Sequence, residues 1–245
     1  MSEESKSARL PLDEQFIQAI QRCAVDECRK LLNQGVDVNH KDRNGNTPIF
    51  HCSTPQHSKI LRFLISAGAN VNVVNVTGSS PLHYAAERGC MEVILILMLH
   101  GADPLVVNQN KQKAEDFSPK LKPMMIALMN DRHIYSSLTE TYKKKLSLIF
   151  DDIDRDGSGV LNLEKSMKFN RYMEDIPADI ARRDAQDFLR DVGICHSGQV
   201  NLDEWLFSFA KLVHERGNEA LDQFIEDYER IGKEKTKFED FVPRD

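Results

Sequence analysis

Five residues between positions 154 and 162 bring oxygen atoms to alternate positions of the chain. Four do so through side chains and one through its backbone carbonyl: Asp154, Asp156, Ser158, Asn162 and Val160. Oxygens at this spacing, with Gly159 allowing a sharp turn, are the ligands that calcium takes in a 12-residue loop. The twelfth position is Lys165, where such a loop needs a bidentate carboxylate. The residues therefore indicate cation binding, weakened by a positive charge at the closing position.

Helices must hold this loop on both sides. A stripe of apolar residues at helical spacing precedes the loop, and another helical pattern follows over 164–175. The same plan recurs with a helical pattern over 179–192 and a loop at 193–204. This second loop keeps Gly198 and ends in Glu204, but its first and third positions carry no carboxylate.

This arrangement resembles a paired EF-hand domain over about residues 140–215. The resemblance implies a short bridge between the loops through Leu161 and Val200. The ligand count predicts weak calcium binding in the first loop alone, with a dissociation constant of about 10⁻³ M or weaker. Two readings stay open: a structural pair that works without metal, and a calcium-responsive sensor that alters what the rest of the chain binds.

A further helical pattern over 219–232 follows this pair. Its apolar side consists of Leu221, Phe224, Ile225 and Tyr228, and the tail beyond it carries Phe238 and Phe241. Paired helix–loop–helix units often hold a helix in their groove. We expect the C-terminal segment to be that helix; the alternative is a segment that recruits another protein.

The first half of the chain repeats every 33 residues. Gly35, Gly68 and Gly101 keep this step, and so do Asn39 and Asn72. Thr47 and Ser80, also 33 apart, each precede a proline in the way that helix N-caps do. The pattern therefore predicts that each unit consists of a helix, a turn, a second helix and a loop. The glycine should end the second helix in a left-handed conformation. The units must stack to bury their apolar faces.

The segment SSPLHYAAERGCMEVILILMLHGADP resembles the ankyrin repeat family closely, although Phe50 replaces the family's usual histidine in the preceding unit. The predicted units are 12–45, 46–78, 79–111 and an eroded cap at 112–131. The predicted fold class is all-α. It comprises a short ankyrin solenoid of three to four repeats in a domain over 1–133, followed by an EF-hand helical domain over 134–245.

The resemblance implies a protein-binding surface on the loop tips and inner helices. The candidate contact residues are Val74, Val76, Tyr84, Glu87 and Arg88. The two valines stand where the family favours polar residues, and exposed apolar tips favour a partner surface. The alternative is that they pack on a neighbouring repeat or on the second domain.

The composition limits the kinds of partner and the cellular compartment that we expect. The chain has 38 acidic and 32 basic residues, and the acidic excess lies after residue 135, which argues against nucleic acid as a partner of that half. No apolar run has the length of a membrane span, and the N-terminus lacks a signal-peptide pattern. Five cysteines without a CxxC pair favour reduced thiols in the cytoplasm.

Enzymatic readings have little support in the sequence. The DxDGS stretch at 154–158 also resembles a phosphoryl-accepting motif, but that motif follows a buried strand and here the preceding pattern is helical. The pair Cys195 and His196 lacks a second cluster at zinc-ligand spacing. We therefore predict a non-enzymatic adaptor for other proteins, with calcium in the first loop as its one candidate cofactor.

Overall fold

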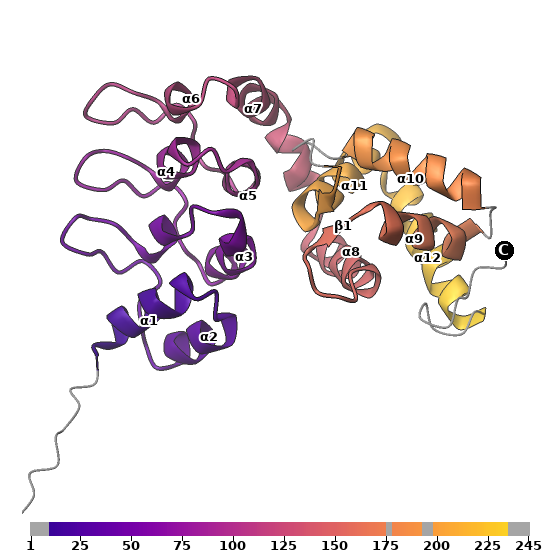
Figure 1. Cartoon of the computed structure of the whole chain (residues 1–245), viewed down its shortest axis with the longest axis horizontal. Coiled ribbons are helices and arrows are strands. Elements are labelled where there is room, and N and C mark those ends of the chain that lie inside the picture. The colour runs from indigo at the N-terminus through magenta and orange to yellow at the C-terminus, as the bar shows by residue number, and fades with distance from the viewer. Residues whose placement is uncertain (1–9, 175–177, 193–197, 235–245) are drawn as a thin grey trace, which may run out of the picture. The chain divides into compact units, whose positions relative to one another are not determined.

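The chain is mostly helical, as the periodicity of its apolar residues predicts (Figure 1). The computed structural model describes residues 10–174, 178–192 and 198–234. The chain divides into two compact units, Met1–Met129 and Asn130–Asp245, which we describe separately.

The first unit is a stack of helix pairs whose connecting loops all project from the same side of the stack (Figure 1). Its elements are α1 (Leu12–Gln21), α2 (Val25–Asn33), the 3-10 turns η1 (Pro48–His51) and η2 (Pro55–His57), α3 (Ser58–Ser66), α4 (Pro81–Glu87), α5 (Met91–Leu99) and α6 (Ala114–Phe117). The helix α7 (Lys122–Ser137) follows. Val93 to Leu99 are all buried, so α5 forms the centre of the core.

Asparagines tie each repeat to the next. The Asn39 side chain donates to the Gly68 carbonyl at 3.0 Å and accepts from the Asn70 N–H at 2.8 Å. Asn72 makes the equivalent two bonds, to the Gly101 carbonyl at 2.9 Å and from the Asp103 N–H at 2.8 Å. The three repeat glycines have φ values of +94°, +91° and +88°, which confirms the predicted left-handed helix ends.

The second repeat departs from the predicted pattern. In place of a full first helix it has only the turn η1, because Pro55 lies too close to allow helix to continue. The helix α7 runs on to Ser137, and its Tyr135 is only 3% exposed.

The second unit contains two helix–loop–helix hairpins and one more helix. The hairpins are α8 (Glu140–Ile153) with α9 (Leu163–Glu174), and α10 (Ala178–Val192) with α11 (Leu202–Arg216). The strands β1 (Val160–Leu161) and β2 (Val200–Asn201) pair antiparallel, with Leu161 opposite Val200, as the sequence predicts. The last helix is α12 (Asn218–Glu234).

Two equivalent cap positions give a matched test of the repeat structure. Ser80 forms hydrogen bonds with His83 Nδ1, through its N–H at 3.1 Å and its hydroxyl at 2.8 Å. In the second repeat Phe50 replaces that histidine, and the buried Thr47 hydroxyl has no hydrogen-bond partner among the described residues. We expect Ser80→Ala to lower the free energy of unfolding by about 1 kcal/mol. Thr47→Val should leave it unchanged or raise it. Thermal unfolding of the two variants by circular dichroism checks this, and equal losses would contradict it.

Candidate functional site

The loop at 154–165, here called the first loop, is shaped by its own hydrogen bonds. Asp154 Oδ2 accepts from the Gly159 N–H at 2.7 Å, and Asp156 Oδ1 accepts from the Ser158 N–H at 3.0 Å. Gly157 and Gly159 adopt φ values of +65° and +79°, which side chains rarely allow. These bonds turn the predicted ligand oxygens toward one point inside the loop.

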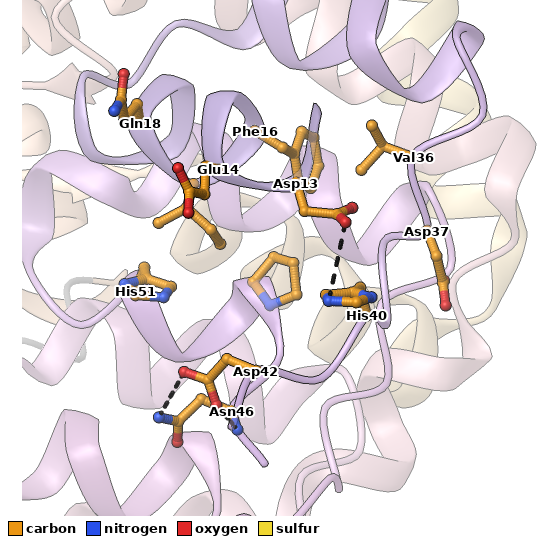
Figure 2. Close-up of a pocket in the computed structure, with 12 residues that line it drawn as sticks. Asp13, Glu14, Phe16, Gln18, Val36, Asp37, His40, Asp42, Asn46 and His51 are labelled. Carbon is orange, nitrogen blue, oxygen red and sulfur yellow. Dashed lines mark hydrogen bonds and ion pairs between the residues drawn. The ribbon is translucent and has the colours of Figure 1, made fainter. Parts of the chain in front are cut away.

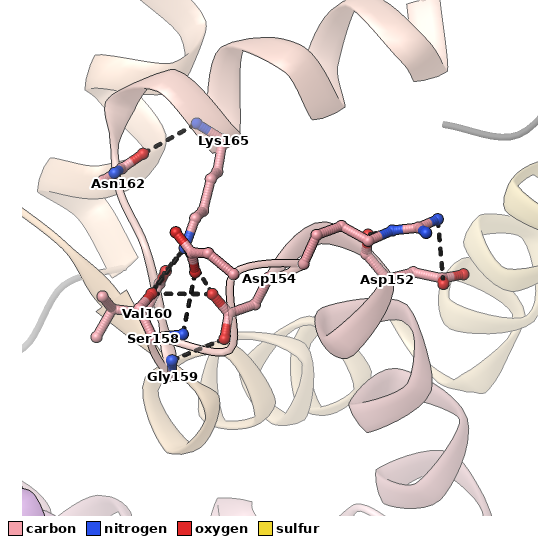
Figure 3. Close-up of polar contacts among 9 residues, drawn as sticks. Asp152, Asp154, Ser158, Gly159, Val160, Asn162 and Lys165 are labelled. Atoms are coloured by element: carbon pink, nitrogen blue, oxygen red, sulfur yellow. Dashed lines mark hydrogen bonds and ion pairs between the residues drawn. The ribbon is translucent and has the colours of Figure 1, made fainter. Parts of the chain in front are cut away.

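That point is taken by the ammonium group of Lys165 (Figure 3). Its Nζ lies 2.6 Å from Asp154 Oδ1, 2.5 Å from Asp156 Oδ1 and 2.7 Å from Ser158 Oγ. It also donates to the Val160 carbonyl at 3.0 Å. The structure therefore gathers four of the five predicted ligands around a cation that the chain itself supplies.

The fifth predicted ligand, Asn162, has another role. Its Oδ1 accepts from the backbone N–H of Lys165 at 3.0 Å, so it caps the start of α9. Glu164, the neighbouring carboxylate, has a partner outside the first loop. Its Oε1 pairs with Lys168 at 2.7 Å on the exposed side of α9.

Electrostatics favour the ammonium form at this centre. Burial acts to lower the pKa of Lys165, but hydrogen bonds to Asp154 and Asp156 outweigh it, so this pKa lies above its ordinary value. The same ammonium holds the pKa of Asp156 below its usual range. The Asp154 side chain is 5% exposed and that of Lys165 12%, so this ion pair is largely shielded from water.

The first loop does not fit calcium in this arrangement. Calcium takes six to eight oxygens at about 2.3–2.6 Å, and four of its expected ligands already surround a nitrogen. A metal ion would have to expel the ammonium, and no carboxylate occupies the closing position. Among the described residues, no group of three or more His, Cys, Asp or Glu side chains is arranged to hold a metal ion.

The second loop contributes a helix cap. Glu204 is 1% exposed and its Oε2 accepts from the Asn201 N–H at 2.9 Å. Asn201 Oδ1 in turn accepts from the N–H groups of Asp203 and Glu204 at 3.0 Å. This reciprocal pattern is a capping box at the start of α11. Residues 193–197, including Cys195, lie outside the described residues.

The helix α12 packs on the aromatic side of α9 and α11. The ring of Phe224 lies 4.8 Å from that of Phe209 and 6.4 Å from that of Phe169, measured between centroids. Leu221 is fully buried and Ile225 is 4% exposed. The chain thus covers this surface with its own helix; the tail residues Phe238 and Phe241 lie outside the described residues.

Two of the predicted contact residues of the repeat unit lie on a loop, and the other three lie on α4 or at its end. Val74 and Val76 are 42% and 59% exposed on the loop after α3. Tyr84 is half-buried: its hydroxyl accepts from the Asn75 side chain at 3.1 Å, and its ring meets the edge of Phe50 at 5.2 Å. Glu87 and Arg88 are exposed at the end of α4.

The sequence reading missed two further exposed apolar residues on the next loop. Leu105 is 57% and Val107 is 49% exposed. The 33-residue step from Val74 to Val107 is the signal that could have found the second of them. The Gln109 side chain donates to the Val76 carbonyl at 2.7 Å, so the two loops lie side by side. We call Val74, Val76, Leu105 and Val107 the apolar loop tips.

Comparison with known proteins supports the assignment of ankyrin repeats in the first unit. The family model of ankyrin repeats matches residues 16–108 in three copies. No curated protein matches the chain. None of the helices in the described part of the chain is both long and apolar enough to span a membrane. Residues 16–108 of the first unit thus match ankyrin repeats, which implies protein partners.

Proposed function

We propose that this chain is a non-enzymatic adaptor that binds another protein through its ankyrin repeats and works without calcium. The ankyrin repeats and the apolar loop tips support the binding role, since adjacent exposed apolar residues mark interaction surfaces. The free thiols Cys23, Cys28, Cys52 and Cys90 agree with a reducing compartment such as the cytoplasm.

We further propose that the second unit is an EF-hand pair in which parts of the chain replace the two usual ligands. These ligands are a metal ion in the first loop and a partner helix in the groove. The position of the Lys165 ammonium carries this proposal, because it supplies the positive charge that a metal ion would bring to the first loop. The helix α12 takes the place of a partner helix, because it packs on the aromatic side chains of α9 and α11. Such a pair keeps one conformation whether cellular calcium is high or low.

The alternative function is a calcium-responsive adaptor. It is favoured by the retained geometry of the first loop, in which Asp154, Asp156 and Ser158 converge on one point. In that reading, calcium displaces the Lys165 ammonium, and the change in the second unit alters binding by the ankyrin repeats.

Calorimetric titration of the metal-stripped full chain with calcium, at near-physiological magnesium, separates these functions. We expect no binding heat at micromolar calcium, since the dissociation constant should be about 10⁻³ M or weaker. Amide hydrogen exchange of the second unit should likewise be the same in calcium and in chelator. A micromolar site, or calcium-dependent exchange in the first loop, would establish the sensor instead.

A further inference from the structure

A pocket of about 370 Å³ lies in the first repeat, between α1 and the loop that leads to η1 (Figure 2). Its apolar lining comes from Phe16, Ile17, Val36 and Pro48. Phe16 and Pro48 belong to the buried core, so the floor of the pocket is fixed by the packing of the repeat. The pocket is therefore preformed.

Carboxylates surround this apolar floor. Figure 2 shows Asp13 on α1 facing His40 on the loop, and Glu14, Asp37 and Asp42 also line the pocket. None of the described lining residues is lysine or arginine.

Two histidines complete the rim. Burial lowers the pKa of His51, so its ring stays neutral. His40 Nε2 lies 3.9 Å from Asp13 Oδ2, and both side chains remain about half exposed. The pocket thus combines an apolar interior with a rim that carries four carboxylates.

This combination fits one kind of side chain. Arginine and lysine have an aliphatic stem, which packs on apolar surface, and a cationic end, which seeks carboxylates. Arginine fits best, because its five N–H donors can serve carboxylates on both α1 and the loop at once.

We infer that this pocket binds an arginine or lysine side chain of a partner peptide, with apolar neighbours on that peptide resting on the pocket floor. This inference rests on the proposed adaptor function and names the chemistry of the partner: a basic, partly apolar segment.

The chain offers a matched pair of variants for the test. Asp13 and Glu14 lie in the first turn of α1, and Asp26 and Glu27 lie in the first turn of α2, outside the pocket. Neutralising either pair changes the net charge and the helix dipole interaction equally. Only the first pair removes carboxylates from the pocket.

The probe is a displayed library of random decapeptides, selected on the full natural chain, with affinities then measured by fluorescence anisotropy. We expect enrichment of arginine or lysine beside apolar residues. The double variant Asp13→Asn, Glu14→Gln should weaken these peptides by about 10-fold or more, since two charge-assisted contacts are lost. The double variant Asp26→Asn, Glu27→Gln should leave their affinity unchanged.

Enriched peptides without cationic residues, or equal weakening by both double variants, would overturn the pocket assignment. Peptides that no longer bind the Val76→Asp variant, but still bind the double variant Asp13→Asn, Glu14→Gln with full affinity, would also overturn the pocket assignment. That last result would leave the adaptor function intact, because binding would then use the apolar loop tips.

Discussion

Lys165→Glu is expected to convert the first loop into a calcium site with a dissociation constant on the order of 10⁻⁵ M, at least about 100-fold tighter than the natural chain. The substitution removes the ammonium that now contacts Asp154, Asp156 and Ser158. It also places a carboxylate at the twelfth position, where calcium takes a bidentate ligand. The backbone of the loop needs no rebuilding, because its turn is set by bonds that do not involve the lysine side chain.

Calorimetry measures the affinity of this variant, and the fluorescence of Trp205 reports the change in the second unit. Trp205 is the only tryptophan of the chain and packs 6.1 Å from Phe150, which lies on the helix that enters the loop. Without calcium, the variant should be less stable than the natural chain, since three carboxylates then face one another.

Lys165→Gln is the matched control, because it removes the positive charge without supplying a carboxylate. We expect it to bind calcium at least about 10-fold more weakly than Lys165→Glu. If the glutamate and glutamine variants bind calcium equally, the missing carboxylate is not the reason for the weak natural site. If neither binds, the first loop does not hold the geometry on which our proposal depends.

The first loop also shows where sequence reasoning stops. Residue types and spacing predicted that Asp154, Asp156 and Ser158 would meet, and they do. The same reasoning treated Lys165 as a lost ligand, because it counted what the twelfth position fails to supply. The direction of a lysine side chain depends on its surroundings, and only the folded loop shows the ammonium turned inward.

The repeat unit was more predictable, since its evidence is periodic. A 33-residue step fixes the glycine turns and the asparagine bonds between repeats, as the equivalent roles of Asn39 and Asn72 show. Departures arose where one residue broke the period. Pro55 reduced a helix to one turn, and Phe50 left the Thr47 hydroxyl without its histidine partner.

The acidic pocket could not be found from the sequence at all. Asp13 and Asp42 are 29 positions apart, and no periodic signal links them. Each looks like an ordinary surface carboxylate until the repeat folds and brings α1 over the loop. Sites of this kind depend on the stacking of elements rather than on a motif.

The helix α12 provides the prediction with the largest effect on stability. Leu221→Ala should lower the free energy of unfolding of the second unit by about 3 kcal/mol, because Leu221 is fully buried and its loss leaves a cavity. Glu226→Ala, on the exposed side of the same helix, should change it by less than about 0.5 kcal/mol. Urea unfolding followed by Trp205 fluorescence measures both, since Trp205 lies 5.0 Å from Phe209, a ring that α12 contacts. Equal effects of the two variants would mean that α12 is not an integral part of this unit. The surface of α9 and α11 would then be open to a helix from another protein, and the adaptor would have a second binding site.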